Sequence, residues 1–170
     1  MIPSRNFKSP LWMAALVLMV AVVPFSGCSK KPSSDEGAPA INAAAAEENA
    51  LGDSDSGKAG GLQTIQFAYD SFVLDNASKE TLKANVQILK DKASFKVQIE
   101  GHCDQRGGIQ YNIALGEKRA NAVRKFMIDL GVSGDRLTTI SYGKERTIDS
   151  RETEEAYAKN RRANFAITAR

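Results

Sequence analysis

The sequence predicts an α+β domain in residues 62–170, a mixed two-layer fold in which helices pack on one mixed β-sheet. Segments with the two-residue apolar alternation of strands take turns with segments that have the three-to-four-residue apolar spacing of helices. The order is strand, helix, strand, helix, strand, short helix, strand. A segment of this length suits one compact domain. Such an order predicts a helix layer against the sheet, with right-handed crossovers between parallel strands.

The first three elements are predicted in residues 64–101. TIQFAYD alternates and indicates a strand, and FKVQIEG alternates strictly and indicates another. Between them, DNASKETLKANVQILKD has its apolar residues on one helical stripe, and Asn76 and Ser78 are candidate caps at its start. A helix is therefore expected between the two strands.

The second half of the domain continues the alternation. The apolar spacing predicts a helix over residues 112–130, with Gly131 as its C-cap because glycine readily adopts the left-handed conformation found there. DRLTTISYG indicates a third strand, TEEAYAKN a short helix and RRANFAI the last strand.

The first 27 residues have the features of a secretory signal peptide. Basic Arg5 and Lys8 precede the apolar run LWMAALVLMVAVV, which is shorter than the roughly 20 residues that a membrane-spanning helix needs. FSGC then resembles a bacterial lipobox, which implies that Cys28 is lipidated and becomes the mature N-terminus. Ser29 in place of an aspartate favours the outer membrane. The alternative is an ordinary cysteine after a signal peptide.

Residues 28–61 are predicted to form a flexible tether. They are rich in Lys, Pro, Ser, Gly and Ala and contain no aromatic residue, so they bury too little apolar surface to offset chain ordering. Residues 28–170 carry 21 basic and 20 acidic side chains, a balance that argues against nucleic acid as a partner.

The motif HCD at 102–104 contains the residue types of a cysteine hydrolase or a metal site. A hydrolase needs Cys and His side chains in hydrogen-bond reach, but adjacent strand residues point to opposite faces, and the chain has a single histidine. The motif also lacks the spaced ligand pairs of a tetrahedral zinc site. Neither catalysis nor a metal or other cofactor is therefore expected.

Arg119 interrupts the apolar stripe of the predicted helix over residues 112–130. One explanation is that the guanidinium reaches solvent at the edge of the stripe. Another is a buried anionic partner, since an unpaired buried charge is costly. The partner would be either Asp104, in an internal ion pair, or the carboxylate of a ligand.

Asp104 and Arg119 can also be interpreted as parts of one binding pocket. Asp104 lies on the loop before this helix, Asn112 at its start and Arg119 two turns later on the inward face. A carboxylate, an amide and a guanidinium around one cavity would suit a zwitterion, with an ammonium on Asp104 and a carboxylate on Arg119.

Three motifs resemble the OmpA-like peptidoglycan-binding domain family: IEGHCDQRGGIQYNIALGEKRANAVRKFM, ISYGKE and AYAKNRRANFAI. The resemblance covers residues 62–170. It implies non-covalent binding of the diaminopimelate residue of the peptidoglycan stem peptide. The ligand-binding residues that it implies are Asp104, Asn112, Arg119 and one of the pair Arg161 and Arg162.

Two positions depart from the family pattern. Ala68 stands where many relatives have an aspartate, although Asp70 is kept, so a contact through that missing carboxylate is not expected. Cys103 replaces a small residue, which favours a packing role because a buried thiol behaves as a small hydrophobe.

With the lipobox, the resemblance implies a lipid-anchored outer-membrane protein whose periplasmic domain links that membrane to the cell wall. It further implies a place in the Tol-Pal system of envelope integrity and cell division, with TolB and other Tol proteins as partners. Two alternatives remain: a peptidoglycan-binding lipoprotein of another envelope assembly, and a periplasmic peptidoglycan hydrolase that uses Cys103.

Overall fold

The computed structural model describes residues 51–170 and confirms the predicted order of elements. The predicted signal peptide, Cys28 and the larger part of the predicted tether lie outside the described residues. The elements are β1 (Ile65–Gln66), α2 (Asn76–Asp91), β2 (Lys96–His102), α3 (Ile109–Asp129), the 3₁₀ turn η1 (Gly134–Arg136), β3 (Leu137–Gly143), α4 (Glu154–Asn160) and β4 (Arg162–Ala169). Within this range no helix is both long and apolar enough to cross a membrane.

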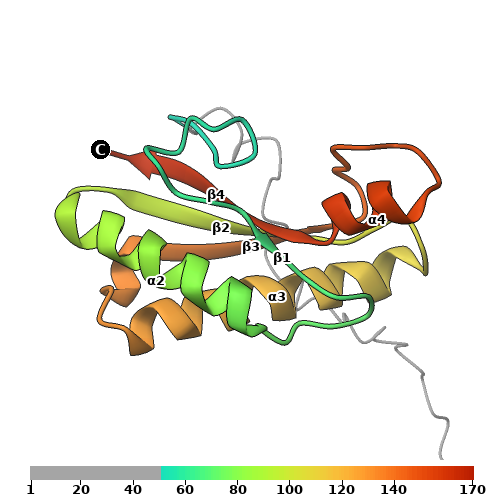
Figure 1. Ribbon diagram of the computed structural model, residues 1–170, viewed down its shortest axis with the longest axis horizontal. Coiled ribbons are helices and arrows are strands. Elements are labelled where there is room, and N and C mark those ends of the chain that lie inside the picture. The colour runs from blue at the N-terminus through green and yellow to red at the C-terminus, as the bar shows by residue number, and fades with distance from the viewer. Residues whose placement is uncertain (1–50) are drawn as a thin grey trace, which may run out of the picture. The chain divides into compact units, whose positions relative to one another are not determined.

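The four strands form one mixed sheet in the order β1-β4-β2-β3. β2 and β3 are parallel, whereas β4 runs antiparallel to both β1 and β2. The long helices α2 and α3 lie on one face of this sheet (Figure 1). The core lies between the two layers, and Leu82, Ile99 and Phe165 in it are fully buried. The predicted two-layer α+β class is therefore confirmed.

Residues 51–61 differ from the flexible tether predicted for residues 28–61. Leu51 donates its backbone N–H to the Ile167 carbonyl (2.7 Å), and Ile167 donates to the Gly52 carbonyl (2.8 Å). Because β1 is short, the second half of β4 has a free edge, and this segment pairs with it. The prediction from amino-acid composition missed this pairing, because strands pair through backbone groups and not through apolar side chains.

The helix ends refine the predicted boundaries. The N-cap of α2 is Asp75, whose carboxylate accepts the Ser78 N–H at 2.7 Å, so neither Asn76 nor Ser78 is the cap. α3 begins three residues earlier than predicted. Its predicted C-terminal glycine is confirmed: Gly131 has φ +95°, and the flanking backbone bonds form a Schellman motif.

Two glycines allow α3 to pack unusually close to the sheet. A Cβ on Gly101 of β2 would lie 1.9 Å from the Gly116 carbonyl oxygen, and one on Gly116 would lie 2.3 Å from Ser141 Oγ. Backbone therefore packs directly on backbone here. Because Arg119 follows Gly116 by almost one turn, this contact brings its side chain close to the end of β2.

Candidate functional site

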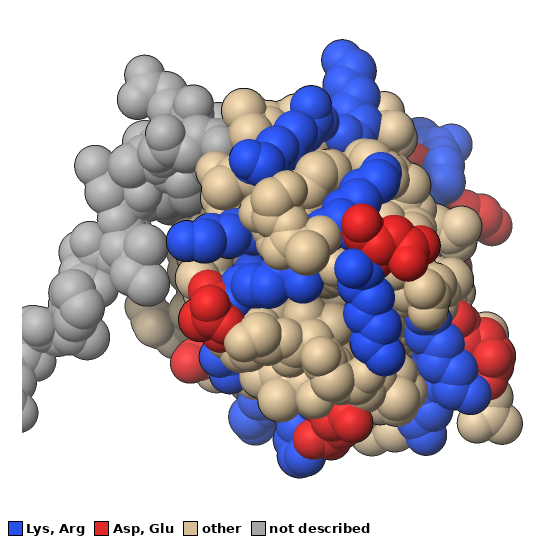
Figure 2. Space-filling view, turned by 90° about the vertical axis from the view of Figure 1, so that its left-hand side faces the viewer, with Lys and Arg blue, Asp and Glu red and all other residues tan. Residues whose placement is uncertain are grey.

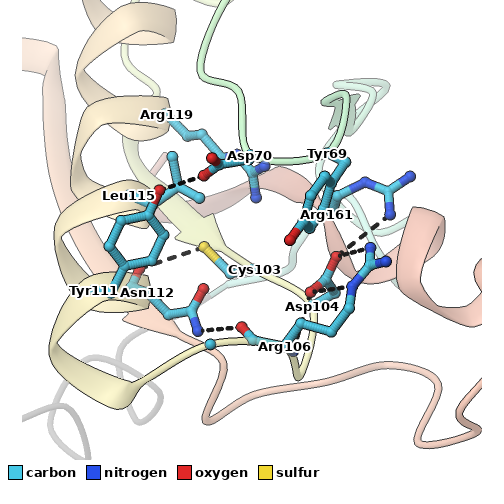
Figure 3. Close-up of a pocket in the computed structure, with 11 residues that line it drawn as sticks. Tyr69, Asp70, Cys103, Asp104, Arg106, Tyr111, Asn112, Leu115, Arg119 and Arg161 are labelled. Carbon is cyan, nitrogen blue, oxygen red and sulfur yellow. Dashed lines mark hydrogen bonds and ion pairs between the residues drawn. The ribbon is translucent and has the colours of Figure 1, made fainter.

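A cavity of about 190 Å³ opens where β2 ends and β4 begins. Figure 3 shows Asp70 and Tyr111 on one side of it, Asp104 and Arg106 on the opposite side, and Cys103 between them. The lining residues come from the loops after β1 and β2, the first half of α3 and the start of β4. They are Tyr69, Asp70, Cys103, Asp104, Arg106, Gly107, Tyr111, Asn112, Leu115, Arg119 and Arg161. Asp104, Asn112, Arg119 and Arg161, one of the predicted arginine pair, therefore meet around one cavity.

Arg119 is held in the cavity wall by main-chain carbonyls. Its Nε donates to Ser71 (2.8 Å), Nη1 to His102 (2.7 Å) and Nη2 to Ala68 (3.1 Å), and the guanidinium lies 5.1 Å from the centre of the Phe67 ring. Burial lowers the pKa of Arg119. The guanidinium thus ties the loop after β1 to the end of β2.

Arg119 neither reaches solvent nor forms the internal ion pair with Asp104. With an exposed fraction of 1%, the side chain does not reach solvent, and within residues 51–170 it forms no ion pair with Asp104 or any other carboxylate. Position 68 contributes its carbonyl, so the missing aspartate there does not affect this contact. A guanidinium has five N–H bonds and these contacts use three, which leaves one N–H on each of Nη1 and Nη2.

Asp104 is buried and engaged by two arginines. Its carboxylate accepts the backbone N–H of Arg106 (3.1 Å) and its Nε (3.2 Å) and Nη2 (2.7 Å), and Nη1 of Arg161 lies 3.4 Å away. Burial opposes ionisation of this carboxyl, but the hydrogen bonds from Arg106 outweigh it and lower its pKa. Asp104 is therefore a carboxylate at neutral pH.

Arg106 is a site residue that the sequence reasoning missed. Its guanidinium lies between two aromatic rings, 4.2 Å from the centre of Tyr69 and 4.4 Å from that of Tyr157, and Nη1 is 3.3 Å from Glu154. The available signal was its position two residues after Asp104, a spacing at which a side chain often bonds to the local backbone. The stacking rings come from distant segments that the spacing does not reveal.

Asn112 and Cys103 shape the floor of the cavity. The Asn112 amide donates to the carbonyls of Arg106 (2.7 Å) and Gly108 (3.2 Å), which fixes the loop after β2. The Cys103 thiol donates to the Asn112 carbonyl at 3.3 Å. The packing role expected for Cys103 agrees with its exposed fraction of 1%.

Asp70 and Tyr111 form the wall opposite Asp104 and were also missed as site residues. The Tyr111 hydroxyl donates to the Asp70 carboxylate, a bond that raises the pKa of Tyr111. Asp70 has φ +49°, a conformation uncommon outside glycine, asparagine and aspartate. The sequence signal was the position of Asp70 at the end of the predicted strand TIQFAYD.

Only the first of the two arginines at the start of β4 faces the cavity. Arg161 donates Nε to the Phe67 carbonyl (3.1 Å) and Nη1 to Glu154 (2.8 Å), in addition to its contact with Asp104. Arg162 points elsewhere and pairs with Asp55 at 2.7 Å. Of the predicted pair, Arg161 is thus the one that lines the cavity and Arg162 is not, because adjacent residues of an extended chain face opposite sides.

The same alternation separates His102 from Cys103, as predicted. Cys103 lines the cavity described above, whereas His102 lines a second cavity together with Glu100 and Arg162, and its ring packs 5.5 Å from that of Tyr142. Burial lowers the pKa of His102 and raises that of Cys103. The two side chains therefore form no nucleophile–base pair. In the described part of the chain, no three His, Cys, Asp or Glu side chains are placed to hold a metal ion.

The fold and the arrangement of the cavity are those of an OmpA-like domain. The chain belongs to the OmpA family, whose model matches residues 66–161. Over most of its length the chain is similar to peptidoglycan-associated lipoproteins. It is 34% identical to the peptidoglycan-associated lipoprotein of Legionella pneumophila, over 96% of both chains. It is 38% identical to that of Pseudomonas aeruginosa, over 89% of this chain and 94% of the other.

Solved structures show the same fold. The peptidoglycan-associated lipoprotein from Burkholderia pseudomallei is 35% identical with a TM-score of 0.59, over 61% of this chain and 88% of that one. The OmpA-like domain of FopA1 from Francisella tularensis is 26% identical with a TM-score of 0.55, over 63% and 73%. The periplasmic domain of Helicobacter pylori MotB, at 19% identity and a TM-score of 0.56 over 62% of this chain and 70% of that one, shares the fold.

Proposed function

We propose that this chain binds peptidoglycan non-covalently, through the diaminopimelate residue of the stem peptide, and links the outer membrane to the cell wall. Membership of the OmpA family and the names of its lipoprotein relatives support the substrate. The observation that carries the proposal is the buried Arg119, which keeps two N–H bonds beyond those used by the protein.

The free end of diaminopimelate carries an ammonium and a carboxylate on one carbon. Its carboxylate binds the remaining N–H bonds of Arg119, where a planar fork matches two oxygens. Its ammonium lies between the carboxylates of Asp70 and Asp104 on opposite walls. A cavity of about 190 Å³ suits the end of one amino acid and is too small for a folded partner.

The ligand ammonium and Arg106 compete for the carboxylate of Asp104. Because the carboxylate already accepts three hydrogen bonds from Arg106 and one from Arg161, an incoming ammonium displaces one of the guanidinium bonds. Glu154 lies next to both Arg106 and Arg161 and is the carboxylate to which a displaced guanidinium turns.

Sedimentation with purified sacculi tests the proposal. The chain without its lipid, residues 29–170, should pellet with sacculi and release no muropeptides. Asp104→Asn and Asp70→Asn should each weaken pelleting because each removes an anionic partner of the ammonium. Cys103→Ala should pellet like the wild type. Muropeptides released by the wild type and not by Cys103→Ala would instead establish the hydrolase alternative.

We propose further that Cys28 carries the lipid anchor, that the domain faces the periplasm, and that the chain acts with TolB and other Tol proteins in envelope integrity and cell division. The lipobox resemblance supports the anchor. Periplasmic cross-linking followed by pull-down tests the partner. Recovery of TolB supports the Tol-Pal role, and consistent recovery of a different envelope assembly without TolB would replace it.

A further inference from the structure

The described domain has two opposite ends, and the ligand cavity occupies one of them. β2 begins at Lys96 and ends at His102, directly before Cys103 in the cavity wall, while β4 begins beside the cavity and ends at Ala169. At about 3.3 Å per residue, a strand of this length separates the two ends by roughly 25 Å. In Figure 1 the chain terminus and the α2–β2 connection lie together at the left, and α4 and the loop before it lie at the right.

The end away from the cavity is rich in basic side chains. We call it the basic end and define it by Lys58, Lys90, Lys92, Lys96, Arg136 and Arg170. Figure 2 shows this side of the molecule, where Lys and Arg cover more of the surface than Asp and Glu. The acidic groups near these six cations are Asp53, Asp91, Asp135 and the terminal carboxylate, whereas Asp129 is paired with Lys125 at 2.7 Å. Positive charge is therefore in excess at this end.

Contacts with one aromatic ring and with main-chain carbonyls hold several of these cations close together. Lys92 Nζ and the Arg170 guanidinium lie 5.1 and 5.9 Å from the centre of the Phe95 ring. Arg136 donates to the carbonyls of Phe95 (2.9 Å) and Lys92 (2.8 Å), so η1 is fixed against the end of α2. The basic end is thus a defined surface made from four segments of the chain.

The chain leaves the domain toward Cys28 at this same end. Arg170 Nη2 donates to the Leu51 carbonyl at 3.0 Å, and Leu51 donates to the Ile167 carbonyl at 2.7 Å. Any lipid on Cys28 is attached through residues that continue from Leu51. The surface nearest to the departing chain is therefore the positively charged one.

We propose that the basic end docks on the anionic phospholipid surface of the membrane that carries the anchor, with the ligand cavity directed away from that membrane. Basic groups near an anionic membrane surface each add to binding, and such a patch acts as a second signal beside a lipid chain. The cell wall is the less suitable partner for the basic end, because the cavity proposed to bind it lies at the opposite end. The orientation rests on the proposed anchor and cavity function, but the lipid affinity does not.

Flotation with vesicles tests this docking independently of the anchor. Residues 29–170, which lack the lipid, should bind phosphatidylcholine vesicles containing phosphatidylglycerol and not vesicles of phosphatidylcholine alone. Binding should weaken as salt rises above about 0.15 M, where the Debye length is about 8 Å. Equal binding to both kinds of vesicle would overturn the proposal.

Charge reversal locates the contact. The double variant Lys90→Glu and Lys96→Glu should lower partitioning by at least about 25-fold, since one basic residue near the surface contributes roughly fivefold. The matched control is Lys79→Glu and Lys83→Glu, which makes the same charge change in the first half of α2 and should lower partitioning far less. Equal losses in the two variants would show that only net charge matters and would refute docking through the basic end.

Sacculus binding separates this proposal from the proposed function. The Lys90→Glu, Lys96→Glu variant should pellet with sacculi like the wild type, because neither residue lines the cavity. Loss of sacculus binding together with unchanged vesicle binding would assign the basic end to the wall and overturn the membrane contact. Loss of wall binding by Asp104→Asn with vesicle binding intact leaves the membrane contact supported.

Discussion

Replacing Arg119 by lysine should weaken both the fold and ligand binding. Lysine keeps the positive charge but has one nitrogen, which cannot reach the carbonyls of Ser71, His102 and Ala68 together. If two of the three bonds are lost, at about 1.5 kcal/mol or more for each bond to a charged donor, the variant loses about 3 kcal/mol of unfolding free energy. That is a large fraction of the roughly 5–15 kcal/mol typical of a domain.

The effect on binding comes from the N–H bonds that the protein leaves unused. Loss of one charge-assisted bond to the ligand carboxylate, about 1.5–3 kcal/mol, should weaken binding by roughly tenfold to 150-fold. Urea unfolding measures the stability change. Calorimetric titration with a diaminopimelate-containing tripeptide, at a temperature where the variant is folded, measures the affinity.

Arg162→Lys is the matched control, because Arg162 is also buried but pairs with Asp55 away from the cavity. It should lose stability and keep wild-type affinity. Wild-type affinity in folded Arg119→Lys, or an equal loss of affinity in Arg162→Lys, would refute the assignment of the ligand carboxylate to Arg119.

Three further predictions concern packing and pH. Gly116→Ala should destabilise the domain by roughly 1–2 kcal/mol in urea unfolding, because overpacking against Ser141 Oγ at 2.3 Å outweighs the helix propensity gained. Unchanged stability would contradict the close approach of α3 to the sheet. Burial lowers the pKa of His102, so the unfolded chain binds a proton that the folded one does not, and unfolding free energy should fall as pH drops below about 6.5. As the chain has one histidine, His102→Gln should remove this dependence between about pH 7 and 5, and a persisting slope would contradict its origin. Burial raises the pKa of Cys103, so a disulfide reagent should label the native thiol much more slowly than the urea-unfolded one, and equal rates would contradict its burial.

The sequence by itself determined the class of fold and the inward position of Arg119. Two-residue and three-to-four-residue apolar periods depend on local geometry alone, so the predicted strands and helices appear at or near their expected residues. Gly131 ends α3 because a left-handed residue is needed there, which is also a local requirement. The opposite orientation of His102 and Cys103 follows from the same local rule.

Tertiary structure alone decided the partners of these residues. Arg119 bonds to carbonyls 17, 48 and 51 positions away, and main-chain acceptors leave no mark in the side-chain sequence. Alternation shows that Arg161 and Arg162 face opposite sides, but the pairing of β4 with β1 and β2 decides which one reaches the cavity. Residues 51–61 become ordered because β4 offers them a free edge, and a free edge exists only once the strands have assembled.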